Sequence, residues 1–523
     1  MVAIVTGNGL GLERGSGNVL GSRGQLGSAA NGRAGEGLTV NAATGNLVLN
    51  DRDEVLIGRG PDSIFSRTYN SLGQATDDNG DNWRLNAQRR VLGLNGTSGT
   101  TGSWILRIDW DGSDTRYDWD TNASAYVSHE GVGARDTITI SGNTVTWTDG
   151  DSRVVETYDL NASGRLLSTK DTDFNTVLYS YDGSGRLSRV TTADGDFTDL
   201  TWSNNNLISL STRVADARTG ATSTLTRTRY EYDSSNRLTK VTVDLSPEDS
   251  SIADGRTYVT TYSYVGTSKL VASIAQTDGS RVDFSYDGSN RVASFTQWVD
   301  ATTSRTTTFA YATGETAITD PASNVTTMKF DTAGQLIKLT EPAALSGGLP
   351  RITKYTWDAH SNNTRIETYD GESNFTADTA NARIQFSYET TTGTLRDTYE
   401  AVNGQYQLTR TYRDAQTNRI LTSSTYTGLA ATASTNVFAA GAMTTRYVYD
   451  SELHLRFTIS PRGPRHRVSL RCSRKPGQHD RLHSHCVLRR HHCRRGHQLQ
   501  RRGLGHLACE HRQEPVEPHR HQL

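Results

Sequence analysis

Cysteine is absent from most of the chain, and histidine is nearly so. All four cysteines and eleven of the fourteen histidines lie after Pro461, which leaves residues 1–460 with no cysteine. A cysteine-free body suits an oxidising, extracytoplasmic setting. No run approaches the roughly 18 apolar residues that a membrane-spanning helix requires. The first residues have neither the basic stretch nor the long apolar stretch of a signal peptide.

Motifs for catalysis and cofactor binding are also missing. The sequence contains no G-x-S-x-G, no H-E-x-x-H and no G-x-x-x-x-G-K-[ST]. The glycine-rich stretch Gly7–Gly17 lacks the flanking strand and helix of a dinucleotide site, so we interpret it as a flexible linker. Asp-rich stretches at residues 77–82 and 109–114 lack the Gly and Glu positions of a calcium loop. They predict turns, with incidental calcium binding as the alternative.

The histidines outside the tail are His129, His360 and His454, and we expect them in surface or hydrogen-bonded positions. Together these absences predict no catalytic, cofactor-binding or metal-binding residues. The sequence therefore favours a protein that is not an enzyme.

One phrase recurs between residues 150 and 460. It reads YSYDGSGRLSRV at Tyr179–Val190, YEYDSSNRLTKV at Tyr230–Val241, FSYDGSNRVASF at Phe284–Phe295 and MKFDTAGQLIKL at Met328–Leu339. Weaker copies surround Tyr158, Trp357 and Tyr449, and fainter ones surround Trp202, Tyr264, Tyr311, Tyr388 and Tyr412. Self-similarity at a period of roughly 20 to 50 residues is typical of a stacked repeat array.

The phrase predicts a β-hairpin. Two aromatic residues two positions apart lie on one face of a strand. The following Asp can end the strand by accepting bonds from its own turn, and the Gly or Asn three residues later suits a type I turn closed by a G1 bulge. Such a hairpin cannot bury its own aromatic face and must stack on its neighbours. We expect this structural repeat to be carried by Tyr158, Asp159, Tyr181, Asp182, Gly185, Arg186, Tyr232, Asp233, Asn236, Arg237, Tyr286, Asp287, Asn290, Arg291, Phe330, Asp331, Trp357, Asp358, Tyr449 and Asp450.

The phrase resembles the Rhs/YD repeat of bacterial Rhs and wall-associated toxins, insecticidal toxin-complex shells and animal teneurins. Upstream, Asn41–Ser71 followed by GDNW at Gly80–Trp83 resembles the segment that precedes the repeats in Rhs proteins. The resemblance implies an all-β fold in which tandem hairpins form a spiral shell, here incomplete. In that family the shell encloses a C-terminal toxin domain.

The expected organisation has four parts. Residues 1–37 form a flexible Gly-rich segment, 38–150 an Rhs-type N-terminal β region, 151–460 the repeat shell and 461–523 a disordered Arg/His/Cys-rich tail. The resemblance implies a secreted or surface toxin carrier whose partners are a C-terminal toxin domain and its immunity protein, with no cofactor and no nucleic acid. We expect this chain to lack that toxin domain and to be inactive. A module that binds surface carbohydrate or a protein is the alternative.

The tail differs in composition from everything before it. Residues 461–523 carry 15 Lys/Arg, 4 Asp/Glu and no aromatic residue, whereas residues 1–460 have a net charge of −12. Its cysteines are too widely spaced for a zinc finger, and a basic arm without aromatics would bind nucleic acid only nonspecifically. A third interpretation is out-of-frame translation: read one base later, codons for Gly463–Pro476 can encode GRVTEYRYDAAGNR, which is another repeat.

The out-of-frame hypothesis makes a prediction about the encoding DNA. Sequencing from codon 440 onward should show codons after Arg462 that yield Tyr-x-Tyr-Asp and further repeats when they are read one base later. Codons that cannot encode this phrase in the shifted frame would contradict the hypothesis. A zinc-binding or nucleic-acid-binding tail would then be the remaining interpretation.

Overall fold

The computed structural model describes residues 2–7, 9–12, 30–31, 36–73, 79–130, 133–215, 219–249, 251–402, 405–429, 442–461 and 469–470. These residues lie in one compact unit, Met1–Cys472, and Ser473–Leu523 make up a second unit. The second unit lies outside the described residues, as do residues 462–468. The disorder and the frame change expected for the tail therefore stay predictions.

The first sheet is built from the N-terminal residues. Its strands are β1 (Ala3–Val5), β2 (Ala30–Asn31), β3 (Glu36–Asn41), β4 (Leu47–Leu56), β5 (Ser63–Asn70) and β6 (Trp83–Leu85). The order is β1-β3-β4-β5-β6, with β2 paired to β3. Strand β1 is parallel to β3, and the other pairs are antiparallel. The 3-10 helix η1 (Asn86–Gln88) links this sheet to the next.

All later strands belong to the second sheet, the repeat sheet. They are β7 (Arg90–Asn95), β8 (Trp104–Ile108), β9 (Asp114–Asp120), β10 (Ala125–Val127), β11 (Thr137–Ser141), β12 (Thr144–Thr148), β13 (Val155–Asp159), β14 (Arg165–Lys170), β15 (Thr176–Tyr181), β16 (Leu187–Thr191), β17 (Phe197–Ser203), β18 (Asn206–Ala215), β19 (Thr222–Tyr232), β20 (Leu238–Asp244), β21 (Thr257–Tyr264), β22 (Val271–Gln276), β23 (Arg281–Tyr286), β24 (Val292–Trp298), β25 (Ser304–Ala312), β26 (Glu315–Thr319), β27 (Val325–Phe330), β28 (Leu336–Glu341), β29 (Arg351–Trp357), β30 (Asn363–Asp370), β31 (Ala382–Tyr388), β32 (Leu395–Val402), β33 (Gln405–Arg413), β34 (Ile420–Leu429), β35 (Met443–Tyr449), β36 (Leu455–Ile459) and β37 (Ser469–Leu470). Short helices are η2 (Leu160–Ala162), η3 (Pro247–Asp249) and α2 (Gly371–Thr376).

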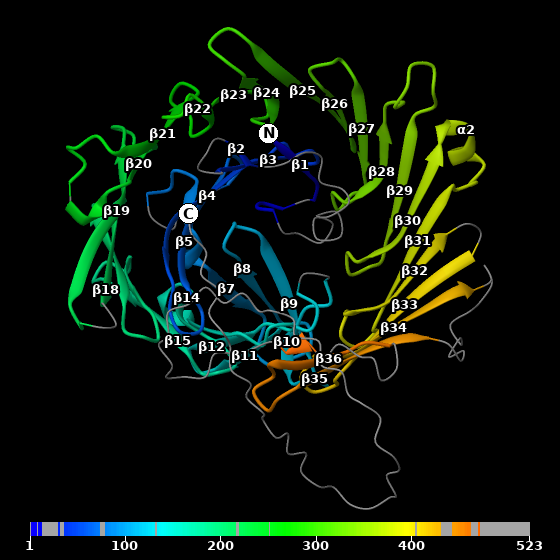
Figure 1. Ribbon diagram of the computed structural model, residues 1–523, viewed down its shortest axis with the longest axis horizontal. Coiled ribbons are helices and arrows are strands. Elements are labelled where there is room, and N and C mark those ends of the chain that lie inside the picture. Colours follow the sequence, from blue (N-terminus) through cyan, green and yellow to red (C-terminus); the bar gives the residue numbers. More distant parts are fainter. Residues whose placement is uncertain are drawn as a thin grey trace, which may run out of the picture. The chain divides into compact units, whose positions relative to one another are not determined.

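Consecutive strands of the repeat sheet pair with one another, and the sheet closes on itself. In Figure 1 the strands follow in order around the blue strands of the first sheet. The all-β fold of tandem hairpins predicted from the sequence is confirmed. Residue 150, where we expected the repeats to begin, lies between β12 and β13. The N-terminal β region from residue 90 onward therefore shares one sheet with the repeats.

The expectation of a flexible segment over residues 1–37 is wrong for its first strand. Residues Val2, Ala3 and Ile4 are buried, and β1 pairs with β3. The physical reason is the apolar run at the start of the chain, which stabilises the strand when it packs into the first sheet. The amide of Asn41 also donates to the Gly7 carbonyl at 3.0 Å, which holds the residues after β1.

The two sheets share one apolar core. Side chains of the first sheet, such as Leu38, Leu49 and Phe65, belong to the same cluster as the inward aromatic and aliphatic residues of β15 to β30. The repeat hairpins bury their apolar face against the first sheet, because a two-stranded hairpin alone offers no second layer. A second, smaller apolar cluster is formed by side chains from strands β7 to β14, among them Ile105 and Tyr117.

None of the described helices has the length and apolar character that a bilayer span requires.

Polar side chains also join the sheets. Arg67 on β5 is 2% exposed, forms an ion pair with Asp53, and donates to the Tyr262 hydroxyl at 3.0 Å. The Tyr230 hydroxyl donates to the other oxygen of Asp53 at 2.7 Å. A buried ion pair survives only when its partners also satisfy its hydrogen bonds. The two tyrosines of the repeat sheet meet this need, so the register between the sheets is fixed.

Candidate functional site

The turn of each repeat is organised by its Asp. In the hairpin β23–β24, one carboxylate oxygen of Asp287 accepts the amides of Ser289 and Arg291 at 2.9 and 3.0 Å. Asn290 has a φ of 63° and donates its amide to the Asp287 carbonyl at 3.0 Å. The strand register shifts between Ser285 and Tyr286. This is the type I turn with a G1 bulge that the sequence predicts.

Several other repeats have the same geometry. Gly185, Asn236 and Gly334 also have positive φ, with values of 79°, 59° and 74°. Desolvation opposes ionisation of Asp287, but bonds from the Arg291 side chain and from the turn amides hold its pKa below the usual value. Turn amides two and four residues later donate to the Asp side chain in the repeats of Asp182, Asp233, Asp331, Asp358 and Asp450.

An aromatic residue near the end of the first strand of a hairpin is tied to the preceding hairpin, whether or not an Asp follows it. The Tyr311 hydroxyl on β25 donates to the Val292 carbonyl on β24 at 2.8 Å. Burial raises the pKa of this hydroxyl, which keeps it protonated as a donor. We call this contact the aromatic staple. It recurs from Tyr181 to Leu166, Trp202 to Leu187, Tyr264 to Leu238, Tyr286 to Val271, Trp357 to Leu336, Tyr388 to Asn363 and Tyr449 to Ile420.

The Arg of the repeat connects the turn to the staple. Arg291 donates to Asp287 of its own turn at 2.8 Å, and its guanidinium lies 4.4 Å from the ring centre of Tyr311. A cation over an aromatic face is attracted by the ring quadrupole. The same stacking joins Arg165 to Tyr181, Arg186 to Trp202, Arg237 to Tyr264 and Arg419 to Tyr449. The sequence pattern indicated Arg186, Arg237 and Arg291 but not their ring contacts, because each aromatic partner belongs to the following hairpin.

Two predicted copies depart from this arrangement. Tyr158 is fully buried, and its hydroxyl contacts Glu156 and Arg107. Asp159 caps the 3-10 helix η2, so its turn is longer than the others. Tyr412 is 60% exposed. Five of the other predicted aromatics pack against the shared core as partly buried residues, namely Tyr181, Tyr232, Tyr286, Phe330 and Trp357.

A cavity of 410 Å³ lies among residues 61–190 and is lined in part by Arg89, Trp110, Trp147 and Tyr179. Glu156 also lines it and pairs with Arg89 at 3.0 Å. Burial disfavours the charged form of Glu156, but the guanidiniums of Arg89 and of Arg107 hold its pKa below the usual value. The cavity thus combines aromatic faces with fixed charges, which is the chemistry of a polar-ligand pocket.

Two of the three histidines outside the tail lie close together. The rings of His129 and His360 lie 5.2 Å apart although they are far apart in sequence. Burial and the neighbouring His360 lower the pKa of His129.

The stretch at residues 109–114 forms the predicted turn, in which the Gly112 amide donates to the Asp109 carbonyl.

Comparison with known proteins agrees with the repeat geometry. Residues 37–117 match the family described as Domain of unknown function (DUF6531), and residues 158–196 match the RHS Repeat family. The hairpins with their Tyr-Asp turns therefore define a β-repeat protein of this class. In these two segments the chain is similar to Rhs/YD-repeat proteins.

Two curated relatives are the tRNA nuclease WapA of Bacillus subtilis strain 168 and the tRNA3(Ser)-specific nuclease WapA of Bacillus spizizenii. Each is 28% identical over 155 residues, which cover 28% of this chain and 6% of the relative. Among solved structures, TcdB2-TccC3 without its hypervariable C-terminal region has a TM-score of 0.41 at 11% identity, covering 79% of this chain and 22% of that one. The TcdB2-TccC3-Cdc42 structure has a TM-score of 0.40 at 11% identity, covering 80% and 26%.

The staple predicts a cost for losing one hydroxyl. Tyr311→Phe keeps the ring over Arg291 but removes the donor to the Val292 carbonyl. We expect the free energy of unfolding to fall by about 0.5–1.5 kcal/mol, the usual net value of one hydrogen bond. Urea unfolding followed by tryptophan fluorescence measures the change.

Tyr412→Phe is the matched control, because Tyr412 is 60% exposed. Its unfolding midpoint should equal that of the parent protein. Equal midpoints for both variants would show that the aromatic staple contributes nothing to stability.

Proposed function

We propose that this chain is the shell portion of a secreted or surface toxin-type protein that encloses or delivers a C-terminal toxin domain, with an immunity protein as the partner of that domain. The chain spans 6% of the length of the curated relatives it matches, so their nuclease activity is not carried over residue by residue. The proposal assigns no catalysis to the described residues. It gives their tyrosines and arginines a purely structural task.

One observation carries the proposal: the repeat sheet closes on itself and packs against another part of the same chain. The first sheet is buried against the aromatic side of β15 to β30. Strands β34, β35 and β36 have no fully buried position, so the packing there is looser. The first sheet covers β15 to β30, whereas β34 to β36 have no fully buried residue. The inner face of the repeat sheet can therefore pack against a further segment of polypeptide, as a shell that encloses another domain requires.

The test uses a gene in which deletion of one base near the Gly463 codon restores the shifted frame. We expect trypsin to leave the polypeptide encoded after the repeats intact within the restored protein, because the shell excludes the protease. The same polypeptide expressed alone is the control and should be digested at least tenfold faster. Mass spectrometry of timed digests gives both rates.

Equal digestion rates for the enclosed and the free polypeptide would contradict a shell function. Digestion of the repeats before the polypeptide that follows them would also contradict it, because the shell can exclude trypsin only while its own strands are intact.

Surface carbohydrate is a second candidate ligand, favoured by the 410 Å³ cavity. Trp110 and Tyr179 offer aromatic faces there, and Asp62 and Arg89 offer polar groups. Sugars bind sites of this kind through stacking and hydrogen bonds. We expect saturable binding on a glycan array, weakened at least tenfold by Trp110→Ala and unchanged by Trp298→Ala, whose ring lies on β24. No saturable binding, or equal binding by both variants, would remove this candidate.

A further inference from the structure

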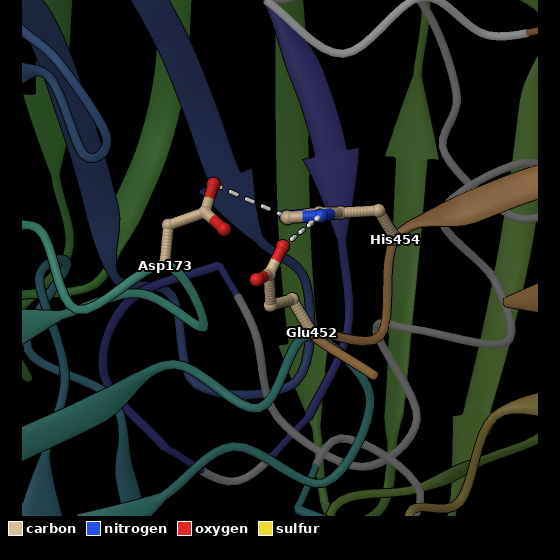
Figure 2. Close-up of side chains that lie close together, drawn as sticks. All are labelled: Asp173, Glu452 and His454. Atoms are coloured by element: carbon tan, nitrogen blue, oxygen red, sulfur yellow. Dashed lines mark ion pairs between the residues drawn. The ribbon is translucent and has the colours of Figure 1, made fainter. Parts of the chain in front are cut away.

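Two turns that are far apart in sequence meet at their tips. Asp173 lies in the turn between β14 and β15, and Glu452 and His454 lie in the turn between β35 and β36 (Figure 2). The His454 Nε2 atom is 3.2 Å from a carboxylate oxygen of Asp173. Its Nδ1 atom is 3.8 Å from a carboxylate oxygen of Glu452. One nitrogen or oxygen atom from each of the three residues lies within 4.8 Å of the other two.

The turn that supplies two of these side chains departs from the repeat. Four residues after the Asp, three other repeats have Arg, which bonds its own turn Asp: Arg186, Arg237 and Arg291. His454 stands at this position and extends to Asp173. Two residues after the Asp, where Ser289 stands in another repeat, this turn has Glu452. Bonds from the amides of Glu452 and His454 to one oxygen of Asp450, at 3.0 and 2.9 Å, fix both residues.

The local charge favours a cation. Asp173, Glu452 and Asp450 place three carboxylates around one imidazole, and Arg456 pairs with Asp450. The His454 Nδ1 atom lies 3.4 Å from a carboxylate oxygen of Asp450, so Nε2, which faces Asp173, is the nitrogen available to an ion. The side chains of Asp173 and Glu452 are 45% and 55% exposed, so an ion can enter from solvent.

We propose that Asp173, Glu452 and His454 bind one divalent transition-metal ion that joins the two turns. One imidazole and two carboxylates are ligands that Zn²⁺ and Mn²⁺ accept. Ligands about 2.0–2.2 Å from a zinc ion lie roughly 3–3.5 Å apart in a tetrahedron, which matches the 3.2 Å between His454 and Asp173. The flexible Glu452 side chain moves closer by rotation, and water fills the remaining position.

The proposed ion bridges residues 281 positions apart in the chain, which the unfolded state does not hold together. It therefore binds the folded state in preference to the unfolded state, and the unfolding temperature rises with the logarithm of the free metal concentration once this exceeds the dissociation constant. The task is structural: the ion fastens the last described hairpin to an early one. This inference is independent of the proposed function, because a container and a carbohydrate-binding module both need a closed sheet.

The test is a titration of the full chain with MnCl₂ at pH 7.5, followed by the electron paramagnetic resonance signal of free Mn²⁺. The tail also contains histidines and all four cysteines, so the cysteines are alkylated first; residues 1–460 have none. Two variants remove one ligand each, His454→Arg and Asp173→Asn. His454→Arg installs the residue found in other repeats and should preserve the fold, and the exposed Asp173 tolerates substitution.

We expect the parent protein to bind one Mn²⁺ more than either variant, with competition by ZnCl₂ at that site. The metal should raise the unfolding temperature of the parent and leave that of His454→Arg unchanged. His360→Ala, the matched control, should bind as the parent does. If the parent and both variants bind equal amounts of Mn²⁺ with equal affinity, the proposal is overturned and the cluster is an ion pair between two turns.

Discussion

The aromatic staple is the interaction on which the rest of the repeat sheet depends. A ring hydroxyl or indole N–H donates to the carbonyl of the residue that directly follows the turn of the preceding hairpin, as Tyr311 does to Val292. In the hairpin before Tyr311, the turn that precedes this carbonyl is set by Asp287, which accepts the turn amides, and by Asn290 with its positive φ. Turn, staple and cation stacking therefore use the same few residues. A change in one of them disturbs the contact between two hairpins as well as one turn.

The first sheet covers the apolar face of the repeat hairpins, which the hairpins cannot bury by themselves. Each hairpin has an apolar face with no covering layer of its own, and β3 to β6 supply that layer for much of the array. Apolar packing is tolerant of small shifts, whereas the buried group of Arg67, Asp53 and Tyr230 is not. An unpaired charge in that place would cost several kcal/mol. The apolar residues therefore supply most of the affinity between the sheets, and the polar group sets their register.

The sequence predicts the features that depend on neighbouring residues, such as the turns, but not the contacts between segments that are far apart in the chain. The turn at Asp287 and its bulge follow from five consecutive residues, so the sequence predicts them well. The same holds for the all-β fold and for the RHS repeat at residues 158–196. The sequence did not predict the strand at Ala3–Val5, because its partner lies beyond a glycine-rich stretch, nor the closure of the sheet. It also left His454 and Asp173 apart, since no periodic signal links two turns at opposite ends of a repeat array.

Departures from the repeat show how the sheet is closed. In the turns of Asp182, Asp233 and Asp287, the Arg side chain contacts its own Asp and the next aromatic ring, both of them near in sequence. In three late turns the pattern changes, and the new side chain contacts a distant segment. Asn362 donates to the His129 carbonyl, Asn418 in a longer turn donates to the Gly150 carbonyl, and His454 meets Asp173. A departure alone is insufficient, since Asn324 bonds only its own Asp320 among the described contacts. The repeat residues build the array, and selected exceptions hold its late hairpins against its early ones.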